Sequence, residues 1–127
     1  MMTDASKTAL ILFAHGSRDP EWASTLKRVS AAVEAQAPRL LLKLAFLELM
    51  PPTLRESCEA LIADGAERII VLPMFIAQGG HLKQDLPEQL DELRALYPHI
   101  NFEQEPPVGE AETVIQAMAA HVLALAK

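Results

Sequence analysis

The sequence predicts an α/β protein with a three-layer α/β/α architecture, in which helices cover both faces of a four-stranded parallel sheet. Four short apolar runs alternate with four longer segments whose apolar residues recur at helical spacing. The runs are apolar almost throughout, which is typical of parallel strands buried on both faces. A chain of 127 residues is long enough for a core of its own. We therefore expect one domain over residues 1–127.

The first strand and helix are predicted at residues 8–14 and 20–35. Residues 8–14 form a continuous apolar run, and the helical segment carries an apolar stripe at Trp22, Leu26, Val29 and Val33. Asp19 precedes Pro20, so its carboxylate can cap the helix while the proline occupies the first turn, where a missing N–H costs nothing. This pair of residues predicts where the helix begins.

The second and third strands are predicted at residues 40–47 and 68–76, which are again apolar runs. Residues 52–64 between them are typical of a helix with an inward stripe of Leu54, Cys58, Leu61 and Ile62. Gly65 is the expected residue after that helix, because glycine readily adopts the left-handed conformation that ends many helices.

The remaining elements complete the alternation. Residues 83–96 predict a helix whose inward stripe comprises Leu82, Leu86, Leu90, Leu93 and Tyr97. A short strand is expected at residues 100–104. The last helix is predicted from Val114, Ile115, Met118, Val122 and Leu125, and we expect it to help cover the sheet.

The order of the strands follows from the handedness of their connections. Right-handed crossovers leave few topologies for four such units, and the order 2-1-3-4 is preferred. In that order the chain reverses direction between strands 1 and 3. Ligands of open parallel sheets bind beyond the carboxyl ends of the strands at such a switch point. A binding site is therefore expected there.

Composition excludes several classes of protein. The net charge of −6 argues against nucleic-acid binding, which requires clustered Lys and Arg. No apolar run approaches the roughly 18 to 20 residues that span a bilayer, so we expect no membrane partner. The first residues lack a secretory signal pattern, which predicts a cytoplasmic location. Cys58 is the only cysteine; this excludes an internal disulfide and predicts a small buried residue.

Three residues with metal-binding side chains are predicted at the switch point. His15 follows the first strand, Glu48 the second and His81 the third. Two imidazoles and one carboxylate suit a divalent first-row metal and leave coordination positions for another partner. Gly16, Gly79 and Gly80 flank the histidines, so a flat ligand or another backbone can approach closely. Each side chain also has an ordinary interpretation as a hydrogen-bonded or solvated loop residue, and His99 and His121 are expected to be structural.

Three segments, HGSRDP, AFLELMPPTL and VLPMFIAQGGHLKQDLPEQL, resemble the short, single-domain CbiX and SirB type of class II tetrapyrrole chelatase. The resemblance spans nearly the whole chain and keeps the order and spacing of the segments. It implies a chelatase-like fold and the insertion of Co²⁺ or Fe²⁺ into sirohydrochlorin; His and Glu ligands also suit Ni²⁺, which is a further candidate. This reaction is an early step toward cobalamin or siroheme and uses neither ATP nor an organic cofactor.

The resemblance also implies residue roles and a partner. His15 would be a metal ligand and the proton acceptor, His81 the second ligand and Glu48 the assisting carboxylate. The loop of Ile76, Ala77, Gln78, Gly79 and Gly80 would lie against the macrocycle. Short members of the family resemble one half of longer two-domain chelatases, so the resemblance implies a homodimer.

The carboxylates of sirohydrochlorin require local positive charge on an acidic protein. Arg18 and Lys83, and more weakly Arg55, are expected at the mouths of the relevant loops, with Ser17 beside Arg18. The N–H groups at the starts of the first and third helices also favour anions. We therefore expect Ser17, Arg18 and Lys83 to contact the substrate.

Two other functions fit part of the pattern. A non-catalytic carrier of a metal or tetrapyrrole would use the same ligands. Phosphohistidine enzymes of the phosphoglycerate mutase type also place His-Gly after their first strand. They surround the histidine with arginines, and the residue before His15 is Ala14, which disfavours that alternative.

Overall fold

The computed structural model describes residues 7–77 and 79–127, apart from the side chains of residues 81 and 82. Four strands form a single parallel sheet in the order β2-β1-β3-β4, as the sequence predicts. Their bounds are β1 Thr8–Ala14, β2 Leu41–Phe46, β3 Arg68–Pro73 and β4 Asn101–Gln104. The third strand is three residues shorter than predicted. It ends at Pro73, although the Met74 N–H that follows still donates to the Phe13 carbonyl of β1 at 2.8 Å.

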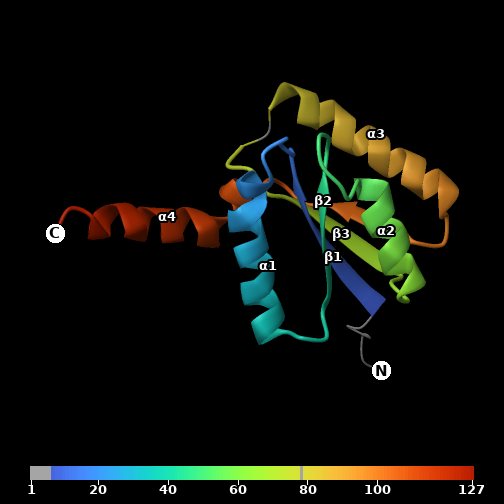
Figure 1. Cartoon of the computed structure of the whole chain (residues 1–127), viewed down its shortest axis with the longest axis horizontal. Helices are drawn as coiled ribbons and strands as arrows, with labels where there is room; N and C mark the ends of the chain where they lie inside the picture. The colour runs from blue at the N-terminus through green and yellow to red at the C-terminus, as the bar shows by residue number, and fades with distance from the viewer. Residues whose placement is uncertain (1–6, 78) are drawn as a thin grey trace.

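The helices follow the strands in alternation (Figure 1). They are η2 Pro20–Ala23, α1 Ser24–Gln36, α2 Leu54–Ala63, α3 Gly80–Leu96, η3 Val108–Glu110 and α4 Glu112–Ala124. The first predicted helix is divided: a 3-10 turn capped by the Asp19 side chain precedes α1. The third helix begins three residues earlier than predicted, at Gly80. No helix among the described residues combines the length and apolar character needed to cross a bilayer.

The larger part of the core lies between the sheet and the pair α2 and α3. Ile11 and Phe13 of β1 and Ile69 and Val71 of β3 are fully buried there. The predicted inward residues of α2 and α3 meet them, namely Leu54, Cys58, Leu61, Leu86, Leu90 and Leu93. Tyr97 is half-buried against the same cluster. The predicted stripe of α3 is therefore confirmed over its described side chains.

Helix α1 covers the opposite face. Leu26 of α1 packs with Leu12 of β1 and with Leu42 and Phe46 of β2 in a second, smaller cluster. Val29, predicted to face the sheet, is 37% exposed. Trp22, predicted on the same stripe, lies on η2 and is also exposed, with its ring edge against Phe46. Trp22 departs from the prediction because the 3-10 turn rotates it off the stripe. Val29 departs from it because α1 covers only part of this face of the sheet.

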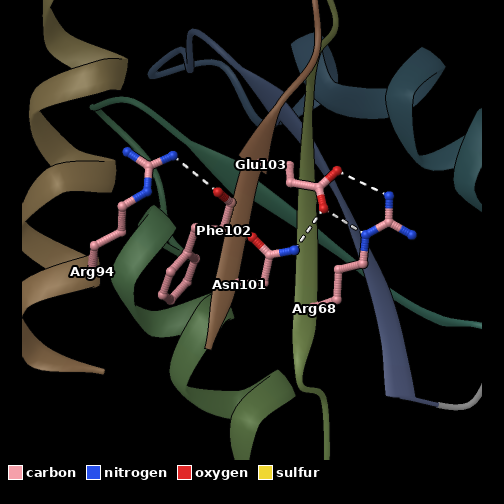
Figure 2. Close-up of polar contacts among 5 residues, drawn as sticks. All are labelled: Arg68, Arg94, Asn101, Phe102 and Glu103. Atoms are coloured by element: carbon pink, nitrogen blue, oxygen red, sulfur yellow. Dashed lines mark hydrogen bonds and ion pairs between the residues drawn. The ribbon is translucent and has the colours of Figure 1, made fainter. Parts of the chain in front are cut away.

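Two features hold the edges of the fold. Thr53 and Glu56 form a reciprocal capping box at the start of α2, and Gly65 has a φ of 101°, as expected of the residue after that helix. At the other edge, Figure 2 shows Arg94 of α3 donating to the carbonyl of Phe102 and Arg68 of β3 bonded through two nitrogens to the Glu103 carboxylate. These bonds fix β4 to its neighbours.

The expectation that the last helix helps to cover the sheet is wrong. Helix α4 extends away from the rest of the structure, and none of its residues is buried (Figure 1). The cause lies in the preceding turn. The Gly109 N–H donates to the carbonyl of Phe75 at 2.9 Å, and only Glu110 and Ala111 separate this anchor from α4. The extended backbone of Ala111 then starts the helix in an outward direction.

Candidate functional site

The first site residue stands directly after the first strand. His15 follows Ala14, the last residue of β1, and its side chain is 49% exposed. Because β1 is flanked by β2 and β3, His15 emerges at the middle of the carboxyl edge of the sheet. This position is the predicted switch point.

Glu48 reaches the same edge from the second strand. Two backbone bonds join the loops, from Leu47 N–H to the Ala14 carbonyl at 2.9 Å and from Glu48 N–H to the His15 carbonyl at 3.1 Å. They continue the ladder between β1 and β2 beyond the strands. As a result, Nε2 of His15 lies 3.6 Å from Oε2 of Glu48, and the Glu48 side chain is 57% exposed. The predicted neighbourhood of His15 and Glu48 is present in the structure.

Gly16 makes this approach possible. Its φ is 102°, in the left-handed region that favours glycine. A Cβ on Gly16 would overlap the backbone carbonyl of Glu48. Of the two partners that the sequence suggested for this glycine, a flat ligand or another backbone, the structure shows the backbone. The glycine therefore serves the pair by letting the Glu48 loop close over the first loop.

The rest of the first loop is ordered by a local hydrogen bond. The Asp19 N–H donates to Oγ of Ser17 at 3.1 Å, and the Asp19 carboxylate in turn caps η2 through the Glu21 N–H at 3.0 Å. Ser17 is half-buried, whereas Arg18 is exposed. Ser17 thus shapes the loop, and the Arg18 side chain is open to solvent at its tip.

The third loop connects β3 to α3. Ile76 is 75% exposed, and Ala77, Gly79, Gly80 and Lys83 are also exposed. Gly79 and Gly80 have nothing near the positions of their absent Cβ atoms. Lys83 lies in the first turn of α3. Gln78 lies outside the described residues.

His81 is the second residue of α3, and its side chain is outside the described part of the structure. The start of α3 lies at the same end of the sheet as the carboxyl ends of β1 and β2 (Figure 1). Among the described residues, no group of three His, Cys, Asp or Glu side chains is close enough to hold a metal ion. The described site therefore contains two of the three predicted ligands, His15 and Glu48.

Two exposed apolar residues near the pair were not predicted as site residues. Leu49 follows Glu48, is 53% exposed and has a positive φ of 73°. Trp22 lies on η2, the turn that follows the first loop, and is also exposed. Leu49 has a weak signal in the sequence, since it is an apolar residue outside a strand and beside a candidate ligand. Trp22 gave a misleading signal, because its spacing matched a helix stripe.

Arg55 is less available to bind a substrate carboxylate than its position in the sequence suggested. Its Nε donates to Oε2 of Glu59 at 3.1 Å, and the Tyr97 hydroxyl donates to the same oxygen at 2.6 Å. The bond from Tyr97, followed by that from Arg55, lowers the pKa of Glu59, and the bond to Glu59 raises the pKa of Tyr97. Arg55 is therefore engaged by a carboxylate on its own helix.

Comparison with known proteins identifies relatives. The CbiX family model matches residues 9–124. A sirohydrochlorin cobaltochelatase of Priestia megaterium is 29% identical over 110 residues, which cover 87% of this chain and 36% of the relative. A sirohydrochlorin ferrochelatase of Bacillus subtilis (strain 168) is 30% identical over 116 residues, which cover 88% of this chain and 43% of the relative. The chain thus spans less than half the length of these two relatives.

Solved structures show the same fold. A protein from Marinobacter aquaeolei VT8, described as a CbiX protein of cobalamin biosynthesis, matches with a TM-score of 0.79 and 27% identity over 91% of this chain and 93% of that chain. The sirohydrochlorin chelatase SirB from Bacillus subtilis subspecies spizizenii, in complex with cobalt, matches with a TM-score of 0.77 and 28% identity over 91% of this chain and 50% of that chain. With a four-stranded parallel sheet in the predicted order and a family match over most of its length, this chain belongs to the CbiX family.

Proposed function

We propose that this protein inserts a divalent cation into sirohydrochlorin, as its relatives are named for doing. Co²⁺ and Fe²⁺ are the proposed metals and Ni²⁺ a further candidate; neither ATP nor an organic cofactor takes part. The observation that carries the proposal is the His15 and Glu48 pair, whose side chains are 3.6 Å apart at the carboxyl edge of the sheet. An exposed imidazole beside a carboxylate can hold a hydrated cation and also accept protons.

The His15 and Glu48 pair can meet two requirements of metallation: the metal ion must be held near the ring, and protons must be removed from it. When M²⁺ enters the ring, two pyrrole N–H protons must leave, so one cation is exchanged for two protons and nothing is oxidised. His15 binds the metal through its neutral imidazole and, once the ion has passed to the ring, accepts one of the two protons, which imidazole does efficiently near neutral pH. Glu48 adds negative charge beside the cation and accepts the other proton. His81 is proposed as the second metal ligand because the loop that leads to it begins at the end of β3, the neighbour of β1.

Residues around the pair suit a flat, polyanionic ring. Ile76 and Leu49 are exposed apolar residues that can contact the macrocycle. Ala77, Gln78, Gly79 and Gly80 are proposed as further contacts, as the resemblance to the family implies. Arg18 and Lys83 are the proposed partners of the substrate carboxylates, since both are charged and exposed. The backbone N–H groups at the start of α3 also favour the binding of anions there. Ser17 orders the first loop, and its hydroxyl is proposed to contact the substrate.

The proposed assembly is a homodimer. The chain covers 93% of the Marinobacter structure but only 50% and 45% of two SirB chains. One copy therefore corresponds in length to about half of the longer proteins. A single domain that pairs with a second copy would supply both halves of such an arrangement.

The test is a metallation assay. Purified protein is mixed with sirohydrochlorin and Co²⁺ or Fe²⁺, and the change in absorbance is compared with the spontaneous rate. We expect His15→Ala to lose at least about 100-fold in rate, the usual contribution of a proton acceptor. His99→Ala is the matched control, because His99 is exposed and stands before β4, at the opposite edge of the sheet. Equal rates for wild type and His15→Ala would refute the assignment.

The same assay separates catalysis from carriage. A catalyst metallates many equivalents of sirohydrochlorin per protein, whereas a carrier stops after binding one. We expect repeated turnover with substrate in tenfold excess. Saturation at one equivalent, with the metallated ring still bound, would favour the carrier.

A further inference from the structure

The turn η3 follows β4 and lies at the carboxyl edge of the sheet. His15, Glu48 and Ile76 follow the ends of β1, β2 and β3 at the same edge, because the strands are parallel. Ligands of open parallel sheets bind beyond this edge. The contacts that η3 makes with the three other loops therefore bear on the proposed site.

The first residues after β3 are fixed by their neighbours. The Met74 N–H donates to the Phe13 carbonyl of β1 at 2.8 Å, and the Phe75 side chain packs against the larger core cluster. The Phe75 carbonyl accepts the Gly109 N–H at 2.9 Å, so η3 lies beside the loop that follows β3, at the base of α4 (Figure 1). The chain thus enters Ile76 from a residue whose backbone and side chain are both held.

Gly109 is in close contact with the backbone of Ile76. A Cβ on Gly109 would overlap the carbonyl oxygen and the Cα of Ile76. Both are backbone atoms, so no rotation of a side chain could relieve the overlap. Gly109 is itself buried. Glycine is needed here for steric reasons, because any larger residue would push the Ile76 backbone away from η3.

Ile76 combines a fixed backbone with an exposed side chain. The side chain is 75% exposed, so it adds little to the core that the neighbouring Phe75 joins. An apolar group on an ordered backbone binds a rigid ring with little further loss of conformational entropy. The position that Gly109 imposes on Ile76 is therefore useful to a ligand that contacts this side chain.

We propose that Gly109 is a positioning residue for substrate binding. It lets η3 close on the backbone of Ile76 and so holds the exposed Ile76 side chain where the tetrapyrrole ring binds. Being buried, Gly109 acts through Ile76. This inference rests on the proposed function and adds the residue that fixes one wall of the ring site.

The metal-binding pair is held by different bonds. His15 and Glu48 are joined through the Glu48 N–H and the His15 carbonyl, and Gly16 gives the Glu48 loop its space. None of these contacts involves η3. A change at Gly109 should therefore affect the binding of the ring and leave the binding of the metal as it is.

The first experiment compares steady-state metallation by the wild type and Gly109→Ala, with Co²⁺ fixed and sirohydrochlorin varied. We expect KM for sirohydrochlorin to rise at least about tenfold and kcat to change by less than about threefold, because a ring contact is lost while His15 and Glu48 are kept. Co²⁺ affinity, measured by isothermal titration calorimetry, should be unchanged. An unchanged KM in folded Gly109→Ala, or an equal loss of Co²⁺ affinity, would overturn the proposal.

Gly65→Ala is the matched control. Its Cβ would have nothing within 4 Å, and Gly65 follows α2 at the opposite edge of the sheet. This variant carries the conformational cost of a left-handed alanine without moving a site loop. Its KM and kcat should equal those of the wild type. A rise in KM equal to that of Gly109→Ala would mean that lost stability alone is the cause, which would overturn the positioning role.

A double-mutant cycle tests whether Gly109 acts through Ile76. Ile76→Ala removes the side chain and keeps the backbone, so it should also raise KM for sirohydrochlorin. The double variant should have a KM close to that of the weaker-binding single variant, because the second substitution removes a contact already lost. If the two effects on KM multiply, Gly109 acts elsewhere and the proposal fails.

The wild type provides a test that does not depend on the folding of Gly109→Ala. Protein labelled with ¹⁵N is titrated with metal-free sirohydrochlorin, and amide chemical shifts are followed. We expect the amides of Ile76 and Gly109 to shift together, since the Gly109 N–H is bonded to the residue before Ile76. The Gly65 amide should stay in place. A shift at Ile76 with none at Gly109 would contradict the coupling.

The same titration separates this inference from the proposed function. Shifts at His15 with none at Ile76 and Gly109 refute the positioning role and leave the chelatase assignment intact. A titration without shifts, together with His15→Ala metallating at the wild-type rate, refutes the chelatase assignment and the positioning role with it.

Discussion

Gly16 and Glu48 lie in loops that follow neighbouring strands, and the carbonyl of Glu48 occupies the space that a side chain on Gly16 would need. The two loops are closed further by the bond from the Glu48 N–H to the His15 carbonyl at 3.1 Å. The position of the Glu48 carboxylate beside His15 therefore depends on a residue that has no side chain of its own.

Gly16→Ala should displace the Glu48 loop and destabilise the fold. The substitution combines a left-handed φ with a backbone overlap, and we expect it to lower the free energy of unfolding by about 3 kcal/mol or more. Metallation should fall together with stability, because Glu48 is moved away from His15. Urea denaturation followed by circular dichroism measures the first effect, and the absorbance assay measures the second.

Gly65→Ala is the matched control. Gly65 has nearly the same φ, 101°, but nothing lies within 4 Å of where its Cβ would be. Only the conformational cost should remain, about 1 to 2 kcal/mol, and metallation should be kept. If Gly16→Ala and Gly65→Ala are equally stable and equally active, the close approach of the two loops has no role in stability or metallation.

Glu48→Gln should weaken metal binding without unfolding the protein. The Glu48 side chain is more than half exposed, and its Oε2 lies 3.6 Å from Nε2 of His15 in the described structure. The amide keeps the shape and removes the charge, so we expect Co²⁺ affinity to fall roughly tenfold or more. Isothermal titration calorimetry with Co²⁺ measures this directly. Glu67→Gln, which removes the partner of Lys7 at the amino end of the sheet, should bind Co²⁺ as the wild type does.

The Arg68 and Glu103 pair should make stability depend on pH in the acidic range. Hydrogen bonding to Arg68 lowers the pKa of Glu103 in the folded protein. A lowered folded pKa stabilises the fold above the ordinary glutamate pKa of about 4.3, and the effect is lost as the pH falls below that value toward the folded pKa. Arg68→Met should therefore lower Tm at pH 7, and its difference from the wild type should shrink toward pH 3.

Thermal unfolding followed by circular dichroism between pH 3 and pH 7 tests this dependence. Glu103→Gln removes the titrating group itself. The Tm of this variant should therefore lack the part of the pH dependence that the ion pair causes in the wild type. A Tm difference for Arg68→Met that stays constant over the whole range would exclude the ion pair as its cause. High salt should reduce the difference, because both side chains are partly exposed.

The apolar runs and the handedness of their connections were sufficient to predict the parallel sheet and its order, because burial on both faces leaves a distinct pattern. The same argument placed His15 and Glu48 at one edge. Tertiary contacts determined what the pattern missed. The 3-10 turn at Pro20 removed Trp22 from its stripe, and the anchor at Gly109 directed α4 outward although its residues are as apolar as those of a core helix. Periodicity identifies an apolar face and does not say which molecule covers it.

Cys58 should be unreactive in the folded protein. Its side chain is 0% exposed in the cluster between the sheet and the pair α2 and α3, and burial raises the pKa of the thiol to about 12. The thiolate is the species that attacks a disulfide reagent, so both its scarcity and its inaccessibility slow the reaction. We expect dithionitrobenzoate at pH 8 to react at least about 100-fold more slowly with the native chain than with the chain in urea. Comparable rates would mean that α2 opens readily from the sheet, which would contradict the packing of Leu54 and Leu61 beside this thiol.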